Sequence, residues 1–211
     1  MQDLTAEMLL AGYAQGIFPM AESRDATELL WFEPQMRGII PLSGFHISRS
    51  LARVIRSGVF TIRIDTAFRA IVEGCAEREE TWINDPLLAL YETLFAYGNA
   101  HSVEVWQGAD LVGGTFGITL GGAFFGESMF SRTPNASKVA LAYTVDHLRQ
   151  AGFGLFDTQY LTPHLASLGG VEIPRDDYRR LLAAALPRRA HFAQPDIPSP
   201  QLLLQRMTQI S

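Results

Sequence analysis

The spacing of apolar residues along the chain predicts a series of helices. The first is expected over residues 4–16, with Thr5 as its N-cap and Gly16 and Pro19 ending it. A later helix is expected to begin at Ser137 as its cap and to be closed by Gly152. The full set of later helices is predicted over residues 48–58, 68–75, 85–97, 137–150, 163–168 and 176–186.

Other segments carry alternating or continuous apolar residues, which is the pattern of strands. Strands are predicted over residues 60–64, 102–106, 111–120, 123–130 and 154–159, with shorter extended pieces over 31–34 and 37–42. The Gly121-Gly122 pair is expected to form a tight hairpin turn between two of these strands. The tail after Pro187 is expected to be loop apart from residues 201–207.

The order of these elements is an antiparallel meander, then a helix, a strand and a helix. This order predicts an α+β protein with helices packed on a mixed sheet. It matches the N-acetyltransferase (GNAT)-like layout, in which the strands before and after the central helix splay apart and open a cleft. The match is an analogy of fold alone. We expect a small, reduced N-terminal domain over residues 1–40, an acetyltransferase-like catalytic domain over 41–190 and a C-terminal tail over 191–211.

Composition narrows the class of protein. A chain of 211 residues that is 47% apolar has room for one full core and a small satellite domain. Cys75 is the single cysteine, so no internal disulfide can form, and we expect it to be a buried apolar residue. No apolar run reaches the length of a membrane span, and the N-terminus lacks the basic start of a signal peptide. These features favour a cytoplasmic protein.

The net charge of −5 argues against bulk binding of nucleic acid, but the basic residues are unevenly spread. Arg49, Arg53 and Arg56 are spaced i, i+4, i+7 on the helix predicted over residues 48–58, so they share one face. This face is either an ordinary solvated surface or a stripe that binds phosphates. The lack of acidic residues between 46 and 64 leaves the two interpretations about equal.

Candidate chemistry gathers after two predicted strands. Glu127 interrupts an apolar strand, so it is expected to be paired, solvated or in a cleft. Asp157 and Gln159 are two residues apart on the next strand, which would place them on one face with Thr158 on the other. There Asp157 would accept a hydrogen bond from the Gln159 side-chain amide, leaving the amide oxygen to receive one from an attacking amine. The alternative is a strand-end pair that satisfies the backbone of a turn.

The remaining signals are weaker. Trp82 lies in a polar loop, where its indole could stack on a base or could instead be a core aromatic. All five histidines are interpreted as structural or solvated, and we expect neither a metal site nor a bound cofactor. The chain has no Gly-rich P-loop, dinucleotide-binding fingerprint or nucleophile elbow.

Taken together, the motifs resemble the leucyl/phenylalanyl-tRNA–protein transferase family. The similar segments occur in the same order over residues 9–19, 45–51, 80–83, 100–106, 126–131, 136–138, 157–159 and 167–169. The resemblance implies an enzyme that moves Leu, and also Phe or Met, from an aminoacyl-tRNA to a protein with an N-terminal Arg or Lys. Such a reaction marks the acceptor for degradation by the N-end rule pathway.

The resemblance also implies roles for individual residues. Asp157 and Gln159 correspond to the family's catalytic pair, and Glu127 to its active-site carboxylate. The family's apolar pocket for the aminoacyl side chain corresponds to Met129, Leu141 and Phe156. Its contact with the terminal adenosine corresponds to Trp82. Its basic tRNA-binding cluster corresponds to Arg49, Arg53 and Arg56. Phe156 differs from the aliphatic residue expected there, so the preference between Leu and Phe stays open.

Two rival functions come from other classes. An N-acetyltransferase of the same fold would need a Gly-rich turn to bind the pyrophosphate of acetyl-CoA, whereas residues 131–138 contain no glycine and include Pro134. A non-catalytic tRNA-binding module would keep the arginine stripe but would have no use for Asp157 and Gln159.

Overall fold

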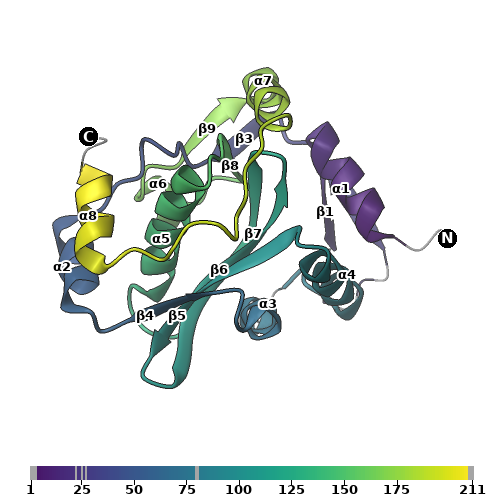
Figure 1. Cartoon of the computed structure of the whole chain (residues 1–211). Coiled ribbons are helices and arrows are strands. Elements are labelled where there is room, and N and C mark those ends of the chain that lie inside the picture. Colours follow the sequence, from purple (N-terminus) through teal and green to yellow (C-terminus); the bar gives the residue numbers. More distant parts are fainter. Residues whose placement is uncertain (1–3, 22, 25, 27, 79–80, 209–211) are drawn as a thin grey trace.

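The computed structural model describes residues 4–21, 23, 24, 26, 28–78 and 81–208 (Figure 1). Glu80, in the motif at residues 80–83, lies outside the described residues. The helices are α1 (Ala6–Gln15), α2 (Arg49–Ser57), α3 (Phe68–Ala76), α4 (Asp85–Ala96), α5 (Ala136–Gln150), α6 (Pro163–Ala166), α7 (Arg175–Ala185) and α8 (Pro200–Thr208). The strands are β1 (Phe18–Ala21), β2 (Leu29–Phe32), β3 (Met36–Ile39), β4 (Thr61–Ile64), β5 (Ala100–Gln107), β6 (Asp110–Leu120), β7 (Ala123–Ser131), β8 (Leu155–Gln159) and β9 (Val171–Pro174).

The main sheet has seven strands in the order β4-β5-β6-β7-β8-β3-β9. Its neighbouring strands are antiparallel except for β7 and β8, which are parallel and are joined through α5. The strands β1 and β2 form a separate two-stranded sheet. The predicted α+β class with a mixed sheet is therefore confirmed.

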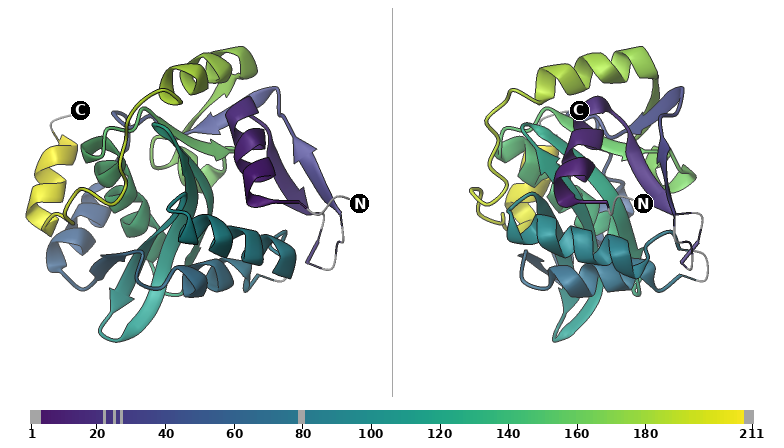
Figure 2. Two further views of the ribbon diagram at one scale, coloured as in Figure 1. Left: turned by 45° about the vertical axis from the view of Figure 1, so that its right-hand side comes forward. Right: turned by 90° about the vertical axis from the view of Figure 1, so that its right-hand side faces the viewer.

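Helices cover both faces of the main sheet (Figure 2). On one face α5 packs against the central strands, and α2 and α8 pack against α5. On the other face α3 packs against β6 and β7, with α4 beside it and α1 against α4. Each face has its own apolar core, so the sheet separates two clusters of buried side chains.

Glycines in β6 permit the close approach of helices to both faces. A Cβ on Gly113 would lie 2.6 Å from Cβ of Ala136 in α5, and a Cβ on Gly114 would lie 2.4 Å from Cδ1 of Ile71 in α3. Atoms cannot pack that closely, so a larger residue at either position would push a helix outward. This explains why the sequence of the strand is punctuated by glycine.

Some details differ from the sequence prediction. Ser137 is not the cap of α5, because the helix begins one residue earlier, after Asn135 in the left-handed conformation (φ 70°). Pro19 does not simply follow the first helix but lies within β1, and β9 was not predicted at all. Both strands have four residues and lie at the edge of their sheets, each paired with one described strand. Edge strands tolerate proline because one side of the strand needs no hydrogen-bond donor. Residues 201–207, the part of the tail that was not expected to be loop, lie in α8.

The parallel strands β7 and β8 separate along their length. Their register pairs only Ala123, Phe124 and Phe125 with residues 155–157. Beyond Gly126 the two strands diverge, and their ends line a common cavity. The expected opening between the strands that flank the central helix is thus present. Among the described residues, no helix combines the length and apolarity that crossing a membrane requires.

Candidate active site

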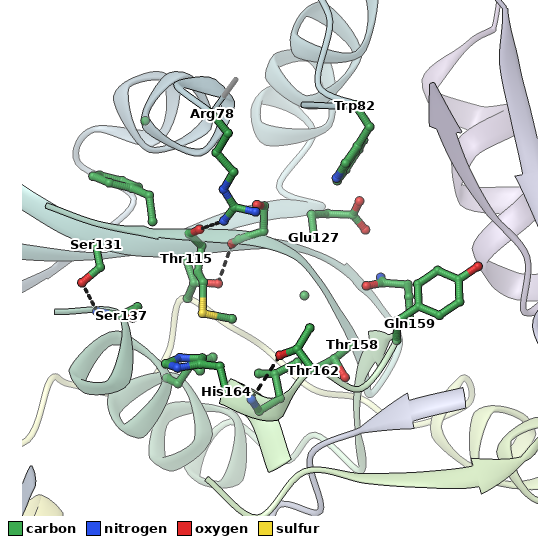
Figure 3. A pocket seen from close by; sticks show the side chains of 18 of the residues that line it. Arg78, Trp82, Thr115, Glu127, Ser131, Ser137, Thr158, Gln159, Thr162 and His164 are labelled. Carbon is green, nitrogen blue, oxygen red and sulfur yellow. Dashed lines mark hydrogen bonds between the residues drawn. The ribbon is translucent and has the colours of Figure 1, made fainter. Parts of the chain in front are cut away.

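A cavity of about 740 Å³ lies where β7 and β8 diverge (Figure 3). Gln159 and Trp82 lie toward one end of it, and Ser131 and Ser137 toward the other. Its wall combines a carboxylate, an amide and several apolar side chains. The residues used below that line it are Arg78, Trp82, Thr115, Glu127, Met129, Leu141, Phe156, Thr158, Gln159 and His164.

Glu127 lies in the wall of the cavity, on the segment of β7 that no longer pairs with β8. Its Oε1 accepts a hydrogen bond from the hydroxyl of Tyr13 at 2.7 Å, and its Oε2 accepts one from Tyr91 at 2.9 Å. Tyr13 comes from α1 and Tyr91 from α4, so two helices of the same sheet face hold one carboxylate. Of the three environments expected for Glu127, namely paired, solvated or in a cleft, the structure shows a hydrogen-bonded carboxylate in the wall of a cavity.

Burial raises the pKa of Glu127 to about 7, and the nearby charge of Asp157 acts in the same direction. The hydrogen bonds from Tyr13 and Tyr91 and the charge of Arg37 oppose this rise. A carboxyl group in this state changes its charge near neutral pH. It can therefore attract a cation or hold a proton, depending on the conditions.

Gln159 ends β8 in the left-handed conformation, with φ of 57°. With its nitrogen facing the carbonyl oxygens of Gly126 and Thr158, the side-chain amide donates to them at 2.9 and 3.0 Å. No described residue donates a hydrogen bond to its oxygen in this orientation, so the oxygen can accept one from a ligand. Left-handed backbone in a residue other than glycine is uncommon and often marks a functional position.

Asp157 does not share a face with Gln159, and this part of the sequence prediction is wrong. Its side chain is fully buried behind the cavity wall, whereas Thr158 and Gln159 both line the cavity. Residues two apart share a face only in a regular strand, and the left-handed backbone at Gln159 interrupts this alternation. Asp157 Oδ1 accepts from the backbone N–H of Gln159 at 2.9 Å, not from its side-chain amide.

Arg37 and Tyr178 are the partners of Asp157 that the sequence analysis missed. Arg37 Nε lies 2.9 Å from Oδ1 of Asp157, and its Nη2 lies 2.6 Å from Oδ2. The Tyr178 hydroxyl donates to Oδ2 at 2.8 Å. Burial and the negative charge of Asp157 raise the pKa of Tyr178, so its hydroxyl stays protonated. An Arg within a predicted strand was the one visible signal, since such a residue needs a buried partner.

The apolar part of the cavity contains the three side chains expected there, namely Met129, Leu141 and Phe156. Phe156 packs edge-on against Phe124, with ring centroids 5.1 Å apart, and this contact fixes its position. Thr115 also lines the cavity, and its hydroxyl is occupied by the carbonyl oxygen of Ser128 at 2.9 Å. The pocket therefore offers an apolar surface to a bound side chain.

Trp82 lines the cavity on the same side as Glu127 (Figure 3). Its ring packs edge-on against Tyr91, with centroids 6.5 Å apart, so it belongs partly to the core and partly to the pocket. Arg78 donates from Nη2 to the carbonyl oxygen of Met129 at 2.5 Å and brings a positive charge to the rim. Burial and the charge of Lys138 lower the pKa of His164 on the opposite wall, which favours its neutral form.

Arg49, Arg53 and Arg56 lie on the exposed face of α2, as the spacing predicts. None of them lines the cavity or forms an ion pair with a described residue. Their helix packs against α5 and α8, on the other side of the sheet from α1 and α4. The described residues contain no group of three or more His, Cys, Asp or Glu side chains arranged to hold a metal ion.

The fold and the cavity define an α+β protein with a buried, carboxylate-containing site between two diverging strands. Residues 39–183 match the family model for leucyl/phenylalanyl-tRNA protein transferase, and residues 2–35 match the model for its N-terminal domain. The chain belongs to the leucyl/phenylalanyl-tRNA protein transferase family, and it is accordingly a transferase.

Relatives match along almost the whole chain. The leucyl/phenylalanyl-tRNA–protein transferase of Paracoccus denitrificans is 59% identical over 208 residues, which is 99% of this chain and 98% of the relative. The protein of the same name from Ruegeria sp. strain TM1040 is 57% identical, covering 99% of both chains. The crystal structure of FemX has a TM-score of 0.47 at 12% identity, covering 85% of this chain and 72% of its own. A TM-score this low adds nothing to the assignment.

Proposed function

We propose that this protein transfers Leu, and also Phe or Met, from aminoacyl-tRNA to the N-terminal Arg or Lys of acceptor proteins. The observation that carries the proposal is a single cavity with an apolar surface at one part and Glu127 and Gln159 at another. The names of the relatives, which are nearly full-length matches, support the tRNA donor and the protein acceptor.

The reaction is the attack of the acceptor's α-amine on the ester carbonyl of the aminoacyl-tRNA. The new C–N bond forms as the bond between the carbonyl carbon and the ribose oxygen breaks. The amine loses one proton and the ribose hydroxyl gains one. An α-amine has an ordinary pKa of about 8, so about a fifth of it is already neutral near physiological pH. The ester is already reactive, and positioning of the two substrates therefore supplies most of the rate.

Each functional side chain has a proposed role in this reaction. The free amide oxygen of Gln159 accepts a hydrogen bond from the attacking amine and orients it. Glu127, in its ionised form, attracts the cationic end of the acceptor. Asp157 supports Gln159 through the backbone rather than by direct contact with a substrate.

The donor is proposed to bind by its 3′ end. Met129, Leu141 and Phe156 would receive the aminoacyl side chain, and Trp82 would contact the terminal adenine. An apolar pocket discriminates weakly between side chains that differ by a methylene, at about 1–3 kcal/mol, so broad apolar specificity is expected. Arg49, Arg53 and Arg56 would bind phosphates elsewhere on the tRNA, since their guanidinium groups are exposed and form no ion pair with a described residue.

The finer assignment of the fold is also a proposal. A GNAT-like sheet would place the tRNA 3′ end in the opening between β7 and β8. The proposed division is a small N-terminal domain over residues 1–40, a catalytic domain over 41–190 and a tail over 191–211. In this division β3 extends the N-terminal part into the main sheet. The proposed context is the N-end rule pathway in the cytoplasm.

The test is transfer of labelled Leu and Phe, in separate reactions, from charged tRNA to peptides that begin with Arg, Lys, Asp or Ala. The proposal predicts incorporation into the Arg and Lys peptides only. Equal incorporation into all four peptides would contradict the acceptor role of Glu127. A lack of transfer together with acetylation from acetyl-CoA would keep the fold and overturn the function.

A further inference from the structure

We infer that Arg37 is a positioning residue for the transfer reaction, acting through Asp157 on the backbone of Gln159. The inference rests on the function proposed above, because it assigns Gln159 to the reacting amine. Arg37 does not line the cavity, so its effect on the reaction must be indirect.

A chain of contacts leads from the guanidinium of Arg37 to the cavity. Arg37 binds both oxygens of Asp157 with two parallel hydrogen bonds, at 2.9 and 2.6 Å. The same Oδ1 accepts from the backbone N–H of Gln159 at 2.9 Å. The carboxylate thus has a fixed orientation, and it holds the amide group of a residue with positive φ. The left-handed backbone of Gln159 is unfavourable for a residue other than glycine, and this hydrogen bond helps to stabilise it.

Each nitrogen of the Arg37 guanidinium donates a hydrogen bond, and the group also stacks against aromatic rings. Its remaining terminal nitrogen donates to the carbonyl oxygen of Gly16 at 2.9 Å. Its guanidinium carbon lies 4.5 Å from the ring centroid of Phe18 and 4.4 Å from that of Tyr178. The residue is only 1% exposed. Burying an unpaired cation would destabilise the fold strongly. The ion pair with the Asp157 carboxylate offsets this cost.

The Arg37 side chain also joins the N-terminal segment to the main sheet. Gly16 ends α1 and Phe18 begins β1, whereas Asp157 belongs to β8. One guanidinium therefore fixes the loop that follows Tyr13 and the strand that ends at Gln159. The contact with Gly16 holds the guanidinium in place, and the contact with Asp157 carries its effect to Gln159.

Arginine is required for this arrangement because of its shape. A lysine at this position carries the charge but has no planar face to stack between two rings and no fork to bind both carboxylate oxygens. Arg37→Lys therefore keeps the positive charge and removes the geometry. Arg180→Lys is the matched control, because Arg180 pairs with Asp177 on the exposed surface of α7.

The experiment measures kcat and the KM values for aminoacyl-tRNA and for an Arg-initiated peptide, well below the melting temperature of each variant. For Arg37→Lys we expect kcat to fall at least about tenfold while both KM values stay within about twofold, since the substrates' own contacts remain. Arg180→Lys should match the unsubstituted protein. An unchanged kcat in Arg37→Lys, or a loss confined to KM, overturns the inference.

A double-mutant cycle separates positioning from general destabilisation. Single-turnover assays with excess enzyme are run on Arg37→Lys, Gln159→Ala and the combined variant. If Arg37 acts through Gln159, the combined variant transfers at the rate of Gln159→Ala, within about twofold. Losses that multiply would show an effect independent of Gln159 and overturn the inference. Failure of the unsubstituted protein to transfer would instead overturn the proposed function, so the two failures are distinguishable.

Discussion

At the scale of single residues, Glu127 is the group whose charge the cavity controls. Tyr13 and Tyr91 donate to its two oxygens, and burial raises its pKa to about 7. The ionised form, to which we assign the attraction of a cationic acceptor, therefore prevails above neutral pH. The same burial makes the ionised carboxylate a cost to the folded state.

Glu127→Gln should affect acceptor binding and stability in opposite directions. We expect KM for an Arg-initiated peptide to rise about tenfold at pH 8, because a charge-assisted contact is lost. The folded pKa lies above the unfolded one, so ionisation lowers the stability of the native protein as pH rises from about 4.5 to 7. The variant should therefore be more stable than the unsubstituted protein by up to about 3 kcal/mol at pH 8, since one pKa unit corresponds to about 1.4 kcal/mol.

The difference in stability should fall to about 1 kcal/mol at pH 5, where Glu127 is protonated in the folded protein and the unfolded carboxyl is still partly ionised. Urea unfolding at the two pH values measures it, and kinetics at pH 8 measure KM. A variant that is equally stable at both pH values relative to the unsubstituted protein would show that Glu127 is not held near neutrality.

Asp157→Asn should cost both stability and activity. The substitution leaves the Arg37 guanidinium buried without its counter-charge, and breaking a buried pair in this way typically costs about 3–5 kcal/mol. Transfer should fall as well, because the hydrogen bond to the Gln159 backbone weakens. Thermal unfolding and a transfer assay provide the two measurements.

Asp177→Asn is the control for this prediction, because Asp177 forms an exposed pair with Arg180 and should lose less than about 1 kcal/mol. Full transfer activity in a folded Asp157→Asn variant would show that Asp157 has no role in the reaction.

At the scale of elements, regular periodicity predicted most of the structure. The long helices and the central strands lie where apolar spacing placed them, because each buries a regular face. The strands β1 and β9 were missed because four residues give too little pattern to detect. Met129, Leu141 and Phe156 were correctly expected to meet in one pocket, on the basis of resemblance.

The site prediction failed where the backbone leaves its regular conformation. A strand rule placed Asp157 beside the Gln159 side chain, and the left-handed turn at Gln159 separates them. Arg37 is 120 positions from Asp157 in the sequence, and no local pattern reveals a pair at that distance. Irregular backbone and distant ion pairs are tertiary features, which propensity and spacing do not encode.

The helix α2 provides the prediction at this scale. Replacing Arg49, Arg53 and Arg56 together by Gln should weaken tRNA binding without altering the cavity, which lies elsewhere. If each guanidinium contacts one phosphate, the slope of log K against log salt should become less steep by about 2–3. Titrations of fluorescent tRNA at several salt concentrations measure the slope.

The control for this titration replaces Arg179 and Arg180 on α7 by Gln, which should leave the slope unchanged because both already pair with acidic side chains. Equal salt slopes for the α2 variant and the unsubstituted protein would show that the stripe is only a solvated face.

At the scale of the whole molecule, the cavity is assembled from segments far apart in the chain. Tyr13 from α1 contacts Glu127 on β7, while β8 supplies Gln159 and the loop before α4 supplies Trp82. The N-terminal segment thus contributes a contact to the cavity wall and also covers one face of the sheet (Figure 2). Its loss would remove a donor from the central carboxylate.

Tyr13→Phe tests this dependence with little change in packing. The hydroxyl of Tyr13 lowers the pKa of Glu127, so its removal should raise that pKa and shift the acid limb of the KM profile for an Arg-initiated peptide upward by about one pH unit. Tyr97→Phe, at an exposed position, should leave the profile unchanged. If both variants give the same profile, α1 has no part in the chemistry of the site.

The most direct measurement is a crystal structure with a non-hydrolysable donor analogue, in which an amide joins phenylalanine to 3′-amino-3′-deoxyadenosine. The account predicts the phenyl ring against Met129, Leu141 and Phe156, the adenine on Trp82, and the analogue's carbonyl carbon within reach of an amine bound by the Gln159 oxygen. An analogue bound outside the opening between β7 and β8, or with its amide turned away from Gln159, would contradict the assignment of this cavity as the transfer site.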